Sequence, residues 1–156
     1  MTERPVIIDI GYIIGGDEGH VLVEKLLSMF TAWAEQQGLA HEVLEKAPAL
    51  GGGLQNAKIV IYCADVESVS ALHAGAHTMI RIPPDDLNQR RHMSSVGVRI
   101  SEHPDLPLPE NMADWGDERR RYFYDPIRAI TDARLGRLEV DPDHVFAGDF
   151  SALEGA

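Results

Sequence analysis

Residues 77–99, HTMIRIPPDDLNQRRHMSSVGVR, hold two strand-like runs with a polar tip between them. The runs HTMIRIP and SSVGVRI contain branched residues or alternate in polarity, which is typical of strands. Pro83 and Pro84 cannot continue a central ladder, so the polar residues are predicted to form a hairpin-like loop. A rigid loop rich in prolines, acids, arginines and a histidine is a good candidate for recognition.

The segments before this hairpin predict alternating strands and helices. Apolar residues recur at helical spacing over 21–37, so this is the strongest helix of the chain. Asp65 is a suitable cap for a second helix. The predicted elements are a strand at 5–10, a turn at 11–16 that leads into the long helix, strands at 41–44 and 57–63, and a helix at 65–74. With the hairpin, this order predicts a single α+β domain in which helices pack on a mainly antiparallel sheet.

The remaining chain changes in character after residue 100. Residues 101–117 contain three prolines and no periodicity, which is typical of a linker or a surface loop. A strand is predicted at 118–124 and a short helix at about 142–147. We therefore divide the chain into residues 1–100, a linker at 101–117, and a segment at 118–156 that packs back on the first hundred residues.

Composition limits the classes of partner. The chain has 156 residues, 44% of them hydrophobic, which is enough for one ordinary core. A net charge of −11 disfavours loose binding to nucleic acid, and no DNA partner is expected. Neither a membrane-spanning run nor a signal peptide is visible, so a cytoplasmic protein without a membrane partner is expected. The single cysteine, Cys63, lies in the apolar run IVIYC and is predicted to be a small core residue.

Two other features have ordinary structural interpretations. Gly51, Gly52 and Gly53 could cradle a phosphate, but no GKS or GKT follows, so a flexible hairpin turn is favoured. The seven histidines are scattered without ligand spacing, so no metal site is predicted. No serine or cysteine nucleophile with a partner base is evident either.

Several short motifs, in order, resemble the class I bacterial peptide chain release factors. The carrying pieces are IGYIIGGDE, LLSMFTAWAE, AKIVIYC, HAGAH, RIPPDD and RRHMSS. They match the codon-recognition domain of these factors over the first hundred residues. The later stretches RRRYFYDPIRAITDARLGRLEVD and VFAGDFSAL look like the closing segment of the same factors, which completes that domain.

The resemblance also indicates which parts of the family are missing. In the family, a catalytic domain with a Gly-Gly-Gln motif lies between these two segments and promotes peptidyl-tRNA hydrolysis. This chain has residues 101–117 in that place and no such motif; GGGLQ at 51–55 matches the turn before AKIVIYC instead. The family's N-terminal helical domain is expected to be missing too. The resemblance therefore implies a codon-recognition domain that is not an enzyme, with no catalytic residue, cofactor or metal.

Ten residues inherit a recognition role from the resemblance. In the family, the glycine-rich tip of the long helix approaches the first codon base, which implies Gly15, Gly16, Asp17 and Glu18. A plain helix start, with Asp17 and Glu18 on the positive end of the dipole, is the alternative. The tripeptide that helps to choose the second base falls on Pro83, Pro84 and Asp85, and His92 matches a histidine that stacks on a base. Arg90 and Arg91 either contact phosphate or form a solvated charged turn.

Two of the three base-reading positions differ in chemistry from the family. Asp85 stands where release factors carry a hydroxyl, and a carboxylate can only accept hydrogen bonds, for example from the amino group of adenine or cytosine. Met93 replaces a threonine used for the third base. The first hypothesis is a translation termination or rescue protein that binds the ribosomal decoding site, with a possible separate Gly-Gly-Gln hydrolase as partner. The alternative is a repurposed protein-interaction module that no longer reads codons.

Overall fold

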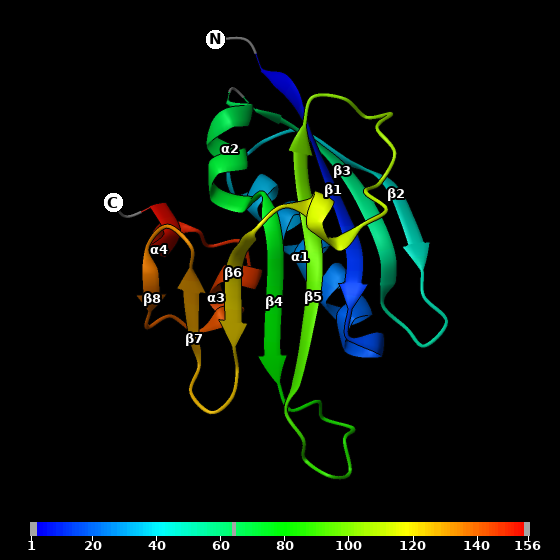
Figure 1. Ribbon diagram of the computed structural model, residues 1–156. Helices are drawn as coiled ribbons and strands as arrows, with labels where there is room; N and C mark the ends of the chain where they lie inside the picture. The colour runs from blue at the N-terminus through cyan, green and yellow to red at the C-terminus, as the bar shows by residue number, and fades with distance from the viewer. Residues whose placement is uncertain (1–2, 64, 155–156) are drawn as a thin grey trace.

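An eight-stranded sheet forms the centre of the protein (Figure 1). The structure is a computed structural model, and it describes residues 3–63 and 65–154. The strand order is β2-β3-β1-β5-β4-β6-β7-β8, and every pair of neighbours is antiparallel except β4 and β6. The strands are β1 (Arg4–Ile14), β2 (His41–Pro48), β3 (Leu54–Cys63), β4 (Gly75–Arg81), β5 (His92–Ser101), β6 (Glu118–Phe123), β7 (Ala129–Asp132) and β8 (Gly136–Leu138). The predicted α+β class with a mainly antiparallel sheet is confirmed.

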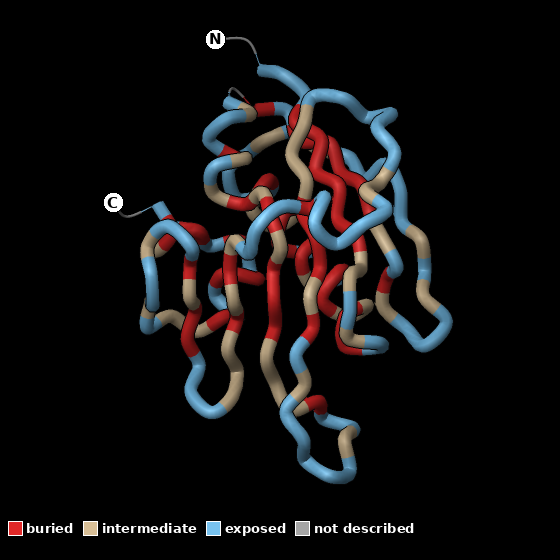
Figure 2. Tube along the Cα trace, viewed as in Figure 1, coloured by how far each residue is buried: buried red, intermediate tan, exposed pale blue. Residues whose placement is uncertain are grey.

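The helices cover mainly one face of this sheet. They are α1 (Gly16–Gln36), α2 (Val66–His73), α3 (Pro142–Phe146) and α4 (Ser151–Glu154), with a 3-10 turn η1 (Met112–Trp115) on the other face (Figure 1). The long helix α1 places Leu22, Leu26 and Phe30 in the core, where none of them is exposed. Asp65 caps α2 by accepting hydrogen bonds from two backbone N–H groups, as predicted. Cys63 is buried in the same core. Figure 2 shows the buried residues gathered in the central strands of the sheet and the helices behind them.

The hairpin of β4 and β5 is confirmed, but several strand ends lie outside their predicted bounds. His92 is the first residue of β5, where it pairs with Arg81, and so lies at the base of the loop. The turn predicted at 11–16 is wrong, because β1 continues to Ile14 and pairs with β5 over most of that length. Strands β2 and β3 also extend further, so their glycine turn shrinks to residues 49–53. In each case ladder hydrogen bonds to a neighbour outweigh the local tendency of glycine and proline to end a strand.

A buried tryptophan fastens the 101–117 segment to the second face of the sheet. Trp115 is 7% exposed, and its ring lies against Gly11 of β1 and Gly97 of β5, which pair directly with each other. A Cβ atom at either glycine would overlap the ring. The two glycines thus provide a flat surface for the indole, and residues 101–117, called the strap below, cross the sheet in front of β1 and β5 (Figure 1). The sequence predicts only a linker or surface loop here.

Polar contacts hold the other half of the strap. Asp9, on the same face as Gly11, is fully buried and pairs with Arg99 Nη2 at 2.9 Å. Arg99 donates to the carbonyl oxygens of Pro107 (2.8 Å) and Leu106 (3.2 Å), and Lys58 donates to that of Pro104. One buried carboxylate therefore orients two cations that bind the backbone of the strap.

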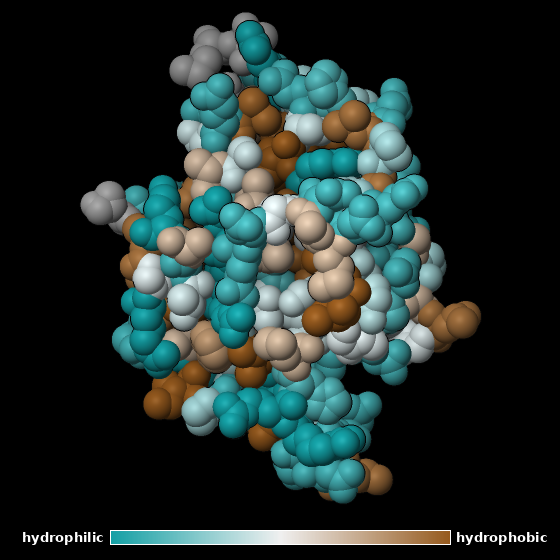
Figure 3. Space-filling model, viewed as in Figure 1, coloured by the Kyte–Doolittle hydropathy of each residue, from teal (hydrophilic) through white to brown (hydrophobic). Residues whose placement is uncertain are grey.

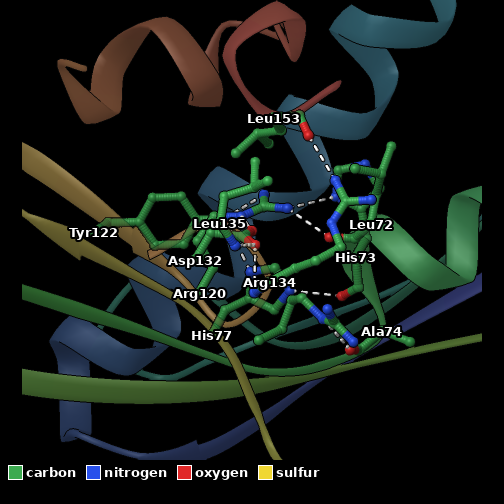
Figure 4. Close-up of polar contacts among 11 residues, drawn as sticks. Leu72, His73, Ala74, His77, Arg120, Tyr122, Asp132, Arg134, Leu135 and Leu153 are labelled. Carbon is green, nitrogen blue, oxygen red and sulfur yellow. Dashed lines mark hydrogen bonds and ion pairs between the residues drawn. The ribbon is translucent and has the colours of Figure 1, made fainter. Parts of the chain in front are cut away.

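The C-terminal strands are joined to the rest by a buried hydrogen-bond network (Figure 4). Arg120 Nη1 donates to Tyr122 Oη (3.1 Å), whose hydroxyl donates to His77 Nδ1 (2.9 Å). His77 Nε2 in turn donates to the carbonyl oxygen of His73 (2.7 Å). Arg120 Nη2 also donates to Leu72 O (2.6 Å) and to His73 Nδ1 (3.3 Å), and Arg120 is fully buried. This pattern requires both histidines to be neutral, because each uses Nδ1 as an acceptor.

The same network lowers the pKa values of both histidines. Burial, followed by the positive charge of Arg120, lowers the pKa of His77 to about 3. The pKa of His73 is lowered well below its usual value for the same two reasons. The folded protein therefore keeps both rings neutral at a pH where unfolded histidines bind protons.

Removing the Trp115 ring should strongly destabilise the fold. We expect Trp115→Ala to lower the free energy of unfolding by about 3–5 kcal/mol, because removal of this large buried ring would leave a cavity over the two glycines. Urea denaturation measures this change. Leu50→Ala, at a fully exposed residue, is the control and should lie within about 0.5 kcal/mol of the wild type. Equal stability of the two variants would contradict the packing role of Trp115.

Acid should destabilise the protein through the two buried histidines. Their pKa values are lower in the folded state than the ordinary histidine value of about 6.5. As the pH falls through 6.5, the unfolded state therefore binds more protons than the folded state, and the free energy of unfolding decreases. Between pH 6.5 and 5 each histidine should contribute a slope of up to about 1 kcal/mol per pH unit. We expect a shallower slope for His77→Gln in urea denaturation over this range. An NMR titration in which the His77 ring of the folded protein protonates near pH 6.5 would refute the assignment.

Candidate functional site

A cleft of about 780 Å³ lies between the start of α1, the turn after β2 and the β4–β5 loop. Nine of the ten residues singled out from the sequence line it, although they come from stretches more than sixty positions apart. They are Gly15, Gly16, Asp17, Glu18, Pro83, Pro84, Asp85, Arg90 and His92. The β4–β5 loop projects beyond the sheet and is mainly hydrophilic at its surface (Figures 1 and 3).

Two left-handed glycines form the turn that directs α1 toward the cleft. Gly15 has φ = 118°, and a Cβ atom there would lie 2.5–2.9 Å from side-chain and backbone atoms of Ser94. Gly16 has φ = 58° with open space around it, and its N–H donates to Tyr12 Oη at 2.8 Å. Glycine is therefore required at 15 by both backbone conformation and close approach, but at 16 by conformation alone.

An ion pair joins the helix start to the end of β4. Arg81 Nε lies 2.5 Å from Glu18 Oε1, and Arg81 Nη2 lies 2.7 Å from Glu18 Oε2, which is a bidentate geometry. Glu18 is only 9% exposed, and the hydrogen bond to its carboxylate raises the pKa of Arg81. Both carboxylate oxygens of Glu18 are thus engaged within the protein, so Glu18 has a clear structural role.

Asp86 organises the loop that carries Asp85 and His92. Its carboxylate accepts hydrogen bonds from the Asn88 N–H (2.9 Å) and from His92 Nε2 (2.7 Å), and it lies 3.4 Å from Arg90 Nε. These contacts, led by the one with His92, lower the pKa of Asp86 to about 2. The carboxylate therefore stays charged at neutral pH, and the loop has a defined shape that fixes one edge of the His92 ring.

The charges at the cleft are distributed unevenly. Arg81 and Arg90 are paired with Glu18 and Asp86. Within the described part of the chain, Asp17 and Asp85 form no hydrogen bond or ion pair, and both are exposed. Carboxylates accept hydrogen bonds, so these two can bind amino groups of nucleic-acid bases or donors of a protein.

Arg91 is the exception among the ten residues. It lies outside the cleft lining, and its Nε is 3.4 Å from Asp125 Oδ2 in the loop after β6. Two residues that the site prediction lacks are central to the cleft, namely Arg81 and Asp86. Asp in a turn commonly accepts from the backbone N–H two positions on, so the role of Asp86 had a sequence signal. The partner of Arg81 lies 63 positions away and has none.

Two kinds of feature are absent from the residues that the structure describes. No group of three or more His, Cys, Asp or Glu residues in residues 3–63 and 65–154 is arranged to hold a metal ion. None of the helices in these same ranges is long and apolar enough to cross a membrane.

Comparison with known proteins identifies the family to which the chain belongs. The sequence pattern of the PCRF domain matches residues 1–98, which is more than half of the chain. The chain belongs to the class I peptide chain release factor family. Peptide chain release factor 1 of Myxococcus xanthus is 28% identical over 113 residues, covering 72% of this chain and 31% of that protein. Peptide chain release factor RF2 of Thermus thermophilus is 33% identical over 99 residues, covering 64% of this chain and 26% of that protein.

The fold agrees with this membership of the release factor family. A solved structure of RF2 of Thermus thermophilus superposes with a TM-score of 0.79 over 97% of this chain, at 21% sequence identity. That match covers 66% of the RF2 chain. The chain spans about a third or less of the length of the curated release factors that it matches.

The two glycines at the helix start should respond differently to alanine. Gly16→Ala meets no neighbour, so it should cost about 1–2 kcal/mol from left-handed strain alone. Gly15→Ala adds a clash with Ser94, so the loss in free energy of unfolding should be clearly larger. Urea denaturation of both variants makes the comparison, with Gly16→Ala as the matched control. Equal losses would show that the close approach of Gly15 to β5 is unimportant.

Proposed function

We propose that this chain is a translation protein that binds the ribosomal decoding site and does not itself hydrolyse peptidyl-tRNA. The single observation that carries the proposal is the shared cleft. Nine residues at positions that resemble the codon-reading positions of release factors converge on one cleft of about 780 Å³. The organised loop and the partly exposed His92 ring offer a surface on which an unstacked RNA base can stack.

The part of the proposal that excludes hydrolysis rests on the sequence between the two release-factor-like segments. No Gly-Gly-Gln motif occurs in the chain, and the strap stands between the two release-factor-like segments. The strap lies on the domain's own sheet through Trp115, Pro104 and Pro107. A separate hydrolase of the Gly-Gly-Gln type is the natural partner in this proposal. Work at the ribosome also agrees with a cytoplasmic location and with neither a DNA nor a membrane partner.

The two exposed carboxylates of the cleft define what it would read. Asp85 and Asp17 offer acceptors only, which suit the amino groups of adenine and cytosine. Their negative charges oppose the phosphates of RNA, so recognition depends on exact placement of bases rather than on general attraction. Occupancy of an empty A site, or competition with an intact release factor, requires less reading than stop-codon selection and remains within the proposal.

A second candidate function is a protein-interaction module built on the codon-recognition fold. The observation that favours it is the pairing of charges: Arg81, Arg90 and Arg91 each form an ion pair, whereas Asp17 and Asp85 form none within the described residues. A basic peptide would complement such a rim. In this case binding would not require the base-stacking face of His92.

Co-sedimentation with ribosomes tests the proposal. Purified protein is mixed with ribosomes that carry a stop codon, a sense codon or no codon in the A site, at two salt concentrations. We expect binding that differs among the three states and weakens with salt. His92→Ala should weaken it by roughly 5- to 100-fold, as expected for loss of one base-stacking contact. His103→Ala, which removes an exposed histidine of the strap, is the matched control and should bind like the wild type.

Two results would contradict the proposal. One is absence of the protein from the ribosome pellet in every state, and the other is binding that His92→Ala leaves unchanged. Salt-insensitive binding to a protein partner, with no ribosome association, would favour the interaction module.

A further inference from the structure

A second pocket adjoins the cleft and shares two of its residues. It has a volume of about 440 Å³, within the usual range for small-ligand sites, and Arg81 and Pro84 line both spaces. Its other walls come from α1, the loop between β6 and β7, and the first turn of α3, which contribute Lys25, Tyr124, Arg128 and Asp143. The Glu18–Arg81 ion pair therefore lies at the boundary between the two spaces.

Three cations line this pocket with hydrogen-bond donors that the protein does not use. Lys25 Nζ makes no hydrogen bond or ion pair within the described residues; it lies over the rings of Phe146 and Tyr124, 5.4 and 5.9 Å from their centroids. Arg81 uses Nε and Nη2 on Glu18, which leaves Nη1. Arg128 uses only Nη1, on Asp141 and Asp143, and leaves Nε and Nη2.

The acids of the pocket are already engaged. Asp143 Oδ1 accepts from the Tyr124 hydroxyl at 2.6 Å, and Asp143 Oδ2 accepts from Arg128 at 3.0 Å. The hydrogen bond from Tyr124, followed by the contact with Arg128, lowers the pKa of Asp143 against the opposing effect of burial. Asp125, the other acid of the lining, pairs with Arg91. The unused groups are thus mainly donors, and a ligand that suits them is rich in acceptors.

We propose that Lys25, Arg81 and Arg128 bind a phosphate group in this pocket. The inference rests on the proposed function in one respect: the phosphate belongs to the RNA strand whose bases enter the adjoining cleft. Phosphate suits the geometry because the three donors approach from a helix, a strand end and a loop, and a tetrahedral group presents oxygens in several directions. Arginine and lysine are the usual protein ligands of phosphate.

The state of Lys25 supports this assignment. Its pKa is lowered, first by burial and then by the positive charge of Arg81, against the smaller opposing effects of the Asp143 and Glu18 carboxylates. A partly buried positive charge beside another is unfavourable, and a bound anion relieves the repulsion. Binding of phosphate should therefore raise the pKa of the Lys25 amine toward its ordinary value.

An NMR titration with inorganic phosphate tests the pocket alone. The lysine side-chain signals of the wild-type protein are followed against pH, with and without phosphate, in chloride of equal ionic strength. We expect the pKa of Lys25 to rise, whereas the signal of Lys46, an exposed lysine on β2, should not respond to phosphate. Lys25→Gln assigns the signal, and the titration needs only the wild-type protein if this variant does not fold. An unchanged Lys25 signal at saturating phosphate would overturn the inference.

Ribosome binding by the Lys25→Gln variant tests whether the phosphate comes from RNA. Lys25→Gln should weaken ribosome binding several-fold at low salt and reduce the slope of log affinity against log salt by about 0.7–1. Lys46→Gln is the matched control for charge. Wild-type binding that Lys25→Gln leaves intact would refute the RNA phosphate while the proposed function stands. Phosphate binding by a protein that never binds ribosomes would support the pocket and refute the proposed function.

Discussion

The bidentate ion pair between Glu18 and Arg81 is the contact on which the cleft and the adjoining pocket both depend. It joins the first turn of α1 to the last residue of β4, two elements that meet only because β1, β5 and β4 are neighbours in the sheet. Arg81 also lines both the cleft and the pocket beside it. Loss of either partner would leave a partly buried charge without its counter-ion, so the pair fixes the helix start and the electrostatics of both spaces together.

The strap gives the sheet a second covered face. In the fold, α1 packs on one face, while Trp115 and the cations oriented by Asp9 hold the chain on the other. The buried network around Arg120 joins β6 and β7 to the hairpin in a comparable way (Figure 4). Residues after 117 thus contribute to the same core as the first hundred, and the site-bearing hairpin is held between β1 and β6.

Local patterns predicted the fold class, the hairpin, the long helix and the Asp65 cap, because each of these depends on neighbours within a few positions. The release-factor resemblance also selected residues that the structure brings into one cleft. What the sequence could not supply were contacts between distant positions. The continuation of β1, the glycine pair beneath Trp115, the parallel pairing of β6 with β4 and the partner of Arg81 all depend on tertiary neighbours. The unused donors of Lys25, Arg81 and Arg128 likewise lie in three separate segments, so the sequence alone does not show that they line one pocket.

The way in which the strap is anchored has a consequence for protein engineering. Lys58 and Arg99 bind carbonyl oxygens of the strap, a group that every residue possesses, and Trp115 is its one buried aromatic anchor. Between these anchors, Glu110 and Asn111 are exposed. A foreign domain inserted between these two residues would leave every fastening contact in place. The strap is thus a natural position for building chimaeras in which this recognition fold carries a reporter or a new effector.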